Sequence, residues 1–127
     1  MPSNYRFEIK SDLSTANRSI KKIIEDFASF ISDENLLFNL RLVLTELVTN
    51  GIIHGNKNDI DKKVFLEIVY NNEKVLIKVS DQGDGIKGGY KLNTDKLNKS
   101  GRGLFLVYQL CDDFKIEGCK VFCSLKL

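Results

Sequence analysis

The sequence predicts a two-layer α/β sandwich in which helices cover one face of a mixed, mostly antiparallel sheet. Apolar residues recur at helical spacing between residues 12 and 55, and short alternating stretches on either side have the period of strands. The order along the chain is strand, two helices, two strands, loop, helix and two strands, which is typical of an α/β fold. At 127 residues, the chain fits one domain spanning residues 1–127.

The first two elements are a short strand and an amphipathic helix. Residues 5–10 alternate and include aromatic and β-branched side chains, which predicts a strand. Asp12 or Ser14 can cap the helix that follows. One face of this helix carries apolar residues at helical spacing, namely Ile20, Ile23, Ile24, Phe27 and Ile31.

A second helix follows, with Ser32 or Asp33 as its N-cap. We expect it to end near His54 and Gly55, because glycine and the asparagine-rich residues 56–59 stop helices. Its apolar stripe consists of Leu36, Leu40, Val43, Leu44, Leu47 and Val48.

The second half of the chain contains four further strands, a loop and a helix. Residues 64–70 and 74–81 are predicted strands joined by a hairpin turn. Residues 82–102 hold five of the nine glycines and have no sustained period, which predicts a long loop of the kind that binds ligands. A helix and two strands around Gly118 complete the chain, over residues 104–111, 114–116 and 121–127.

The composition is that of a soluble globular protein. Hydrophobic residues make up 43% and charged residues 28%, and no apolar run approaches the ~20 residues that span a bilayer. The N-terminus lacks the apolar core of a secretory signal, so we expect a cytoplasmic protein without membrane contact. Cys119 and Cys123 would lie ~13 Å apart on one strand, so the three cysteines are expected to be buried thiols rather than a bridge or a metal site.

The charge distribution favours a polyphosphate ligand over a nucleic acid. A net charge of +2 is too small to predict nucleic-acid binding. Between residues 86 and 102, however, four lysines and Arg102 stand against the single acid Asp95, and aromatic stacking groups are nearly absent. The alternative for these charges alone is a solvated loop.

One face of the second helix carries polar groups able to bind a metal ion and accept a proton. Glu46, Asn50 and His54 are spaced four residues apart, so they share a face at the edge of the apolar stripe. An amide oxygen such as that of Asn50 can ligate Mg²⁺, and a carboxylate one turn away can accept a proton from a hydroxyl. The alternative is that Glu46 and Asn50 only solvate a helix flank.

A carboxylate stands at the end of a core strand. Asp81 has the same parity as Val75, Ile77 and Val79, so it faces the core if they do. A buried carboxylate needs a donor, which an adenine amino group can supply, and the glycines of Asp81-x-Gly83-x-Gly85 permit close approach of a planar base. The alternative is an Asx-type turn in which Asp81 caps its own loop.

A glycine pair precedes the last predicted helix. Gly101-Arg102-Gly103 opens the helix that is expected to begin at Leu104. Free N–H groups at a helix N-terminus favour phosphate, and glycine leaves room for it. The pattern matches neither a Walker-type phosphate loop nor a dinucleotide fingerprint, and a glycine-rich loop without a ligand is the alternative.

Together these motifs resemble the three boxes of the gyrase, chaperone and histidine-kinase ATPase (GHKL) superfamily. The motifs are Glu46-Leu-Val-Thr-Asn50-x-x-x-His54-Gly55, Asp81-x-Gly83-x-Gly85 and Gly101-x-Gly103-Leu104. The short chain and the run Gly-Arg-Gly-Leu-Phe-Leu are similar to the bacterial anti-sigma-factor serine-protein kinases. The resemblance covers residues 5–127 and implies a Bergerat-type, histidine-kinase-like ATPase fold.

The resemblance implies roles for the residues around the base and the metal. Asn50 would hold Mg²⁺, and Glu46 would act as the catalytic base at the attacking group. Asp81 would bind the adenine amino group of ATP, with Gly83 and Gly85 beneath the base.

It also implies a phosphate-binding end. Gly101, Gly103 and the amide of Leu104 would meet the phosphates, and residues 86–102 would form the ATP lid. Further residues would contribute to the nucleotide site or shape the end of its helix: Ile86, Ser100, Arg102 and His54.

The function implied is that of an anti-sigma factor and ATP-dependent serine/threonine-protein kinase in transcription regulation. Such a protein binds a sigma factor, phosphorylates an anti-sigma-factor antagonist and forms a homodimer without contacting nucleic acid. The alternative is a nucleotide-gated binding module with little or no transfer. A detached sensor-kinase half is disfavoured because His54 is the only histidine, and a gyrase or mismatch-repair type because 127 residues leave no room for a transducer domain.

Two positions depart from the family pattern. Gly51 stands where alanine is frequent, and it is expected to weaken the helix by about 1 kcal/mol. Gly118-Cys119 stands where the family has Gly-Thr, and a thiol is a poorer hydrogen-bonding group than a hydroxyl. The adenine-side contact and the nucleotide affinity are therefore expected to be weaker.

Overall fold

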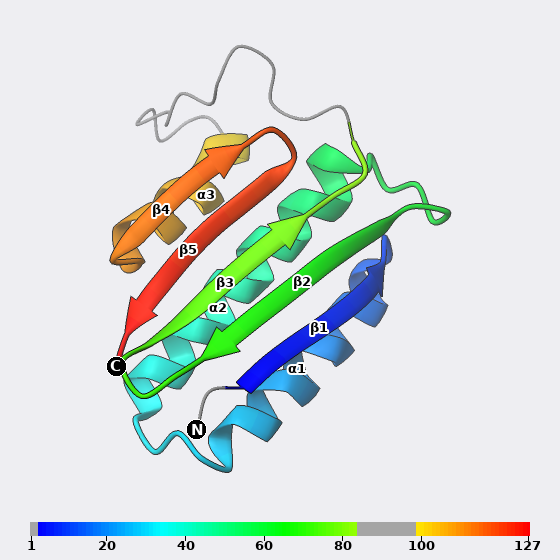
Figure 1. The fold of residues 1–127 in the computed structure, drawn as a ribbon. Helices are drawn as coiled ribbons and strands as arrows, with labels where there is room; N and C mark the ends of the chain where they lie inside the picture. The colour runs from blue at the N-terminus through cyan, green and yellow to red at the C-terminus, as the bar shows by residue number, and fades with distance from the viewer. Residues whose placement is uncertain (1–2, 84–98) are drawn as a thin grey trace.

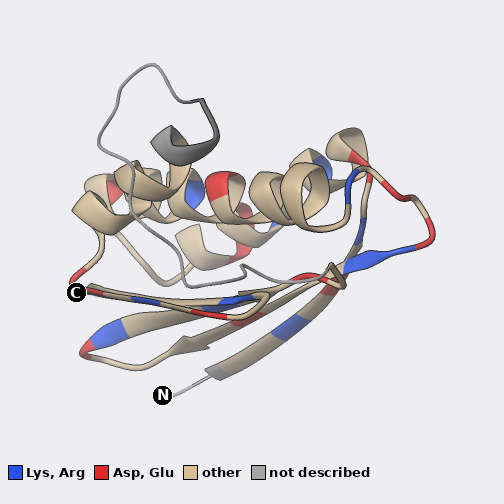
Figure 2. Cartoon of the chain, turned by 90° about the horizontal axis from the view of Figure 1, so that it is seen from above, with Lys and Arg blue, Asp and Glu red and all other residues tan. Residues whose placement is uncertain are grey.

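The fold is a two-layer α/β sandwich. In the computed structural model, which describes residues 3–83 and 99–127 (for 3 and 99–102 the backbone only), one sheet forms one layer and the helices form the other (Figures 1 and 2). The elements are β1 (Ser3–Lys10), α1 (Leu13–Ala28), α2 (Glu34–Asn50), the π-helical turn η1 (Gly51–Gly55), β2 (Lys63–Tyr70), β3 (Lys74–Ser80), α3 (Lys99–Leu110), β4 (Asp113–Glu117) and β5 (Lys120–Lys126).

The predicted fold class is confirmed. The five strands lie in the order β1-β2-β3-β5-β4, and all four pairs are antiparallel. Helices cover only one face of this sheet, as Figure 2 shows. The hairpin between β2 and β3 is closed by Asn71, whose Oδ1 accepts hydrogen bonds from the backbone N–H groups of Glu73 and Lys74.

Aspartates cap both N-terminal helices. Asp12 accepts from the backbone N–H of Thr15 at 3.1 Å, and Asp33 accepts from Asn35 and Leu36 at 3.0 and 3.1 Å. Each was one of two candidates in the sequence. Because these bonds satisfy N–H groups that have no partner inside a helix, they fix where α1 and α2 begin.

Helix α2 lies at the centre of the core. Its buried residues pack against the sheet, α1 and α3. By length and composition alone, the helix over residues 34–55 is apolar enough to cross a membrane, although charged and amide side chains interrupt its apolar residues. The apolar stripe is accounted for by the core, since Leu40, Val43, Leu44 and Val48 are all fully buried.

Helix α3 begins earlier than predicted. It starts at Lys99 rather than at Leu104, so residues 99–102, expected in the loop, are helical. Gly101 and Gly103 therefore lie inside its first turns and do not precede them. Inside this helix, the N–H groups that lack an intrahelical partner are those of its first three residues, 99–101, instead of the amide of Leu104.

The cysteines are thiols, as expected, but their arrangement differs from the predicted one. Cys123 is buried, whereas Cys119 precedes β5 and is half-buried. A hydrogen bond between the Cys111 and Cys123 thiols lowers the pKa of Cys111 and, together with burial, raises that of Cys123. The pair joins the end of α3 to β5.

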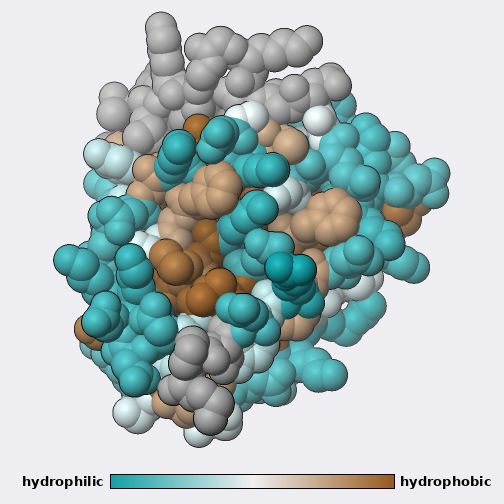
Figure 3. Space-filling view, viewed as in Figure 1, coloured by the Kyte–Doolittle hydropathy of each residue, from teal (hydrophilic) through white to brown (hydrophobic). Residues whose placement is uncertain are grey.

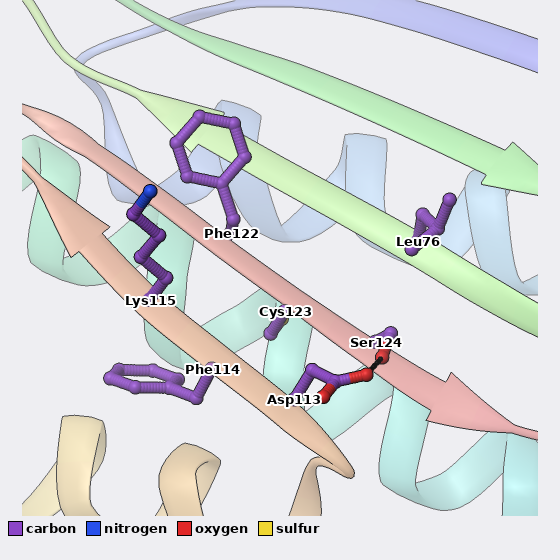
Figure 4. A pocket seen from close by; sticks show the side chains of 7 residues that line it. All are labelled: Leu76, Asp113, Phe114, Lys115, Phe122, Cys123 and Ser124. Carbon is purple, nitrogen blue, oxygen red and sulfur yellow. Dashed lines mark hydrogen bonds between the residues drawn. The ribbon is translucent and has the colours of Figure 1, made fainter.

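None of the described helices covers the outer face of the sheet. Figure 3 shows apolar side chains gathered near its middle, with hydrophilic ones around them. A shallow hollow of about 300 Å³ lies over β3, β5 and β4, with Leu76 and Phe122 at its edge and a hydrogen bond of 3.0 Å from Ser124 to Asp113 within it (Figure 4). The hollow contains none of the residues of the predicted nucleotide site.

Candidate functional site

The polar face of α2 ends in a change of helical pitch. The backbone N–H of Asn56 donates to the carbonyl of Gly51 at 2.7 Å, a bond over five residues that makes Gly51–Gly55 a π-helical turn. Glu46 and Asn50 precede the turn and are half-buried, but His54 lies inside it and is exposed. The pitch widens within Gly51–Gly55, and His54 differs from Glu46 and Asn50 in its exposure; that the three side chains share one face stays a prediction. Such turns occur frequently at functional sites.

Helix α3 approaches that face through a glycine. A methyl group placed on Gly103 would run into Oε2 of Glu46 and lie 3.6 Å from Nδ2 of Asn50. Only a residue without a side chain fits here unless Glu46 moves. The first and third predicted motifs are therefore in contact, although Glu46 and Gly103 are 57 positions apart in the sequence.

Asn50 carries an unsatisfied polar group. Its Nδ2 is buried and has no hydrogen-bond partner among the described residues. A buried donor left alone costs roughly 1–3 kcal/mol, so this part of the site is incomplete without a ligand. Within the described part of the chain, no three carboxylate, thiol or imidazole groups gather as a metal cluster. The side-chain oxygen of Asn50 fits Mg²⁺, which is held by one or two protein oxygens together with phosphates and water, whereas Nδ2 is a donor and does not ligate a cation.

Asp81 lies at the end of β3 and faces the helix layer. Val75, Ile77 and Val79 of the same parity are buried, as predicted, and Asp81 is half-buried. Burial raises the pKa of Asp81 above its ordinary value of 3.8, although the N–H of Gly83 and the charge of Lys62 oppose the shift. Oδ1 accepts a hydrogen bond of 2.8 Å from Gly83, so the Asx-type turn that was the alternative is also present. An Asx-type turn and a carboxylate that accepts from a ligand are compatible at Asp81, because the bond from Gly83 uses Oδ1 and not Oδ2.

Three glycines make room for this carboxylate. A methyl group on Gly55 would run into the Asp81 carboxylate, and one on Gly83 would run into the carbonyl of Gly55. A methyl group on Gly51 would lie 3.0 Å from Cγ2 of Val64 and 3.7 Å from Cβ of Asp81. The departure at Gly51 therefore has a packing reason: the helix end lies so close to β2 and β3 that alanine is crowded.

The second departure also lies beside Asp81. The backbone N–H of Asp81 donates to the carbonyl of Cys119 at 3.1 Å. Gly118 before it has φ +61°, a left-handed conformation that favours glycine in the turn between β4 and β5. The turn thus carries Cys119 to the end of β3.

Sequence reasoning missed two residues of this region, Asn56 and Gln82. Asn56 was interpreted only as part of a helix stop, but its side chain is fully buried and accepts a hydrogen bond from the backbone of Gln82 at 2.7 Å. Periodicity gives no signal for such a contact, because the two residues lie in irregular segments 26 positions apart.

Several predicted site residues cannot be assigned a geometry. Gly85, Ile86 and most of the predicted lid lie outside the described residues, and for Ser100, Gly101 and Arg102 only the helical backbone is described. Leu104 is buried at 7% exposure, so its side chain belongs to the core.

Comparisons with known proteins show a matching family and several relatives. The family model of the histidine kinase-like ATPase domain matches residues 9–122. The chain is 34% identical over 102 residues to the anti-sigma F factor of Oceanobacillus iheyensis, covering 72% of this chain and 70% of that protein. It is 31% identical over 87 residues to the anti-sigma F factor of Bacillus subtilis, covering 64% and 60%.

A third relative carries a kinase name. The serine-protein kinase RsbW of Listeria monocytogenes is 29% identical over 96 residues, covering 65% of this chain and 61% of that protein. The chain thus spans between 60% and 70% of the length of these three relatives.

Proposed function

The chain belongs to the histidine kinase-like ATPase domain family, and from this premise we propose that it is an anti-sigma factor with serine/threonine-protein kinase activity. Its reaction is the transfer of the γ-phosphate of ATP to a serine or threonine of an anti-sigma-factor antagonist. The observation that carries the proposal is the contact between Gly103 of α3 and the Glu46–Asn50 face of α2, beside an Asp81 that lies against the same helix end. The names of the relatives support it.

At the base end, Asp81 accepts a hydrogen bond from the adenine amino group. Oδ1 is already engaged by Gly83, which leaves Oδ2 for the nucleotide. Partial burial strengthens such a bond, because water competes less for the carboxylate. Gly83, and Gly85 beyond it, allow the base to approach the backbone.

At the phosphate end, Glu46 accepts the proton of the attacking hydroxyl, and Asn50 holds Mg²⁺. When bound, the ion neutralises charge on the transferring phosphoryl group. The backbone N–H groups of residues 99–101 at the start of α3 are the donors for the phosphates. Gly103 lets this helix end lie directly against Glu46. Ser100, Arg102 and Ile86 remain assigned to the nucleotide site on the family resemblance.

The partners follow from the same proposal. The chain binds a sigma factor and an antagonist protein in the cytoplasm, acts as a homodimer, and contacts neither nucleic acid nor membrane. The net charge of +2 and the burial of the apolar stripe of α2 support the last two points.

Phosphate transfer tests the proposal. Incubation with radiolabelled Mg·ATP and the cognate antagonist should label the antagonist. Glu46→Gln, which keeps the size of the side chain but removes the base, should lower the rate by about 100-fold or more. The matched control is Glu34→Gln, an exposed carboxylate at the other end of α2, which should label at the wild-type rate.

Undiminished labelling by Glu46→Gln would remove Glu46 from the mechanism. If the wild type labels the antagonist only at background level but binds Mg·ATP in calorimetry, the chain is a nucleotide-gated binding module and not a kinase. Absence of nucleotide binding would overturn the whole proposal.

A further inference from the structure

Asn56 is a fully buried polar residue just after the π-helical turn. Its exposure is 0%, and neither its position nor its side chain belongs to the motifs of the family resemblance. A buried primary amide costs free energy unless its donors and acceptor are paired. At Asn56 they are all engaged. Nδ2 donates to Oγ of Ser11 and to the carbonyl of Lys63, both at 2.9 Å, and Oδ1 accepts from the backbone N–H of Gln82 at 2.7 Å.

These bonds tie three segments to the helix end. Ser11 follows β1 and is itself held by Lys62, whose carbonyl accepts from Oγ at 2.8 Å and from N at 3.2 Å. Lys63 begins β2, and Gln82 follows β3. Asn56 therefore connects the turn after β3 to the end of β1 and the start of β2.

Gln82 completes the connection from the other side. Its Oε1 accepts from the backbone N–H of Lys63 at 2.7 Å, so its backbone and its side chain are both held. Asp81 directly precedes this anchored residue, and its own backbone N–H donates to the carbonyl of Cys119. The peptide groups on both sides of Asp81 are consequently fixed, and with them the direction of its carboxylate.

We propose that Asn56 and Gln82 are positioning residues that set the base specificity of the nucleotide site by holding Asp81 in place. This inference rests on the proposed function, in which Asp81 accepts from the adenine amino group. Only an amide suits position 56, because Lys63 presents an acceptor and Gln82 a donor to the same side chain. Neither residue touches the nucleotide, so their effect is indirect and appears in discrimination between bases.

The test compares Mg·ADP with Mg·IDP, which lacks the amino group, by isothermal titration calorimetry. We expect the wild type to prefer ADP. Asn56→Ala should reduce that preference by about tenfold, toward equal affinity, through weaker ADP binding with IDP binding little changed. Asn56→Asp keeps the acceptor for Gln82 and should retain the preference, although it faces the carbonyl of Lys63 and should melt at a lower temperature.

If Asn56→Ala does not fold, Gln82→Ala tests the same proposal. The residue is exposed, so its truncation leaves the core intact, and the ADP-over-IDP preference should fall. The matched control for burial is Ser124→Ala, at 1% exposure, which removes the hydrogen bond to Asp113 on the other side of the sheet. It should lower the melting temperature without changing the preference.

The outcomes separate the two proposals. A wild type that binds neither nucleotide overturns the proposed function, and this inference with it. A wild type that binds both equally removes Asp81 as the residue that recognises adenine. A wild type that prefers ADP, with the preference unchanged in folded Asn56→Ala or in Gln82→Ala, overturns the positioning role alone.

Discussion

At the scale of single residues, the site depends on polar groups held in partly buried positions. Asp81 is a carboxylate whose pKa burial raises, and Asn50 presents a buried Nδ2 without a partner among the described residues. Both features cost stability in the free protein, and both are of use only when a ligand supplies the missing partner. The chain thus gives up stability at the residues that we propose bind the nucleotide.

Replacing Asp81 by asparagine should stabilise the free protein at neutral pH. Because its folded-state pKa lies above the ordinary 3.8, the contribution of Asp81 is most favourable below pH 3.8 and is lost as pH rises through the raised pKa. The asparagine side chain would mimic the neutral form of the carboxyl group and can still accept from Gly83. The melting temperature of Asp81→Asn should exceed that of the wild type near pH 7, and the difference should shrink as pH falls toward 3.8.

The control for this experiment is Asp61→Asn, an exposed carboxylate in the loop before β2. Its melting temperature should follow the wild type across the same pH range. A melting curve of Asp81→Asn that lies below the wild type at neutral pH would contradict the assigned cost of burial. Mg·ADP should stabilise Asp81→Asn less than it stabilises the wild type.

At the scale of elements, the site forms where packing overrides local preference. Glycine is about 1 kcal/mol less favourable than alanine in a helix, so the run Lys99-Ser-Gly-Arg predicts a loop when the sequence is taken alone. The structure nevertheless makes it the first turn of α3, which packs against α2. The π-helical turn was not predicted either, because its defining bond from the N–H of Asn56 to the carbonyl of Gly51 leaves no signal in the apolar periodicity.

Gly103→Ala should separate stability from activity. In a helix, alanine gains up to about 1 kcal/mol over glycine. The new methyl group, however, occupies the place of the Glu46 carboxylate, which is the flexible end of a side chain and can move aside. We expect an unchanged or higher melting temperature and a phosphate-transfer rate lower by up to about 100-fold, because the catalytic group is displaced.

Gln109→Ala provides the comparison, since Gln109 is exposed on the same helix and touches no site residue. Both its stability and its transfer rate should stay near the wild-type values. Full activity of Gly103→Ala would mean that Glu46 reaches its working position from a different rotamer.

At the scale of the whole molecule, the regular elements could be predicted and the connections between distant segments could not. Alternation in β2 and β3 and the apolar stripe of α2 identified the sheet and its covering layer, because both patterns are local. The bond from Asn56 to Ser11, by contrast, spans 45 positions and joins two irregular segments. No periodicity encodes such a contact, so it appears only once the chain is folded.

Stability should be unevenly distributed over this sheet. Strand β4 pairs only with β5, and its residues alternate between exposed and half-buried, whereas β2 and β3 are paired on both sides and have fully buried residues. Native-state hydrogen exchange should therefore show β4 amides opening at a lower free energy than those of β2 and β3. Equal protection across the sheet would contradict this distribution.

Position 55 is constrained by one side chain, that of Asp81. A methyl group on Gly55 would run into the Asp81 carboxylate, whereas one on Gly83 would meet the carbonyl of Gly55 and one on Gly51 would crowd Val64. Substitutions at positions 55 and 81 therefore cannot act independently: a lineage that lost the carboxylate could place a larger residue at position 55, whereas one that kept it would retain glycine. The history of this pair should thus be epistatic, with residue 81 changing before residue 55 does.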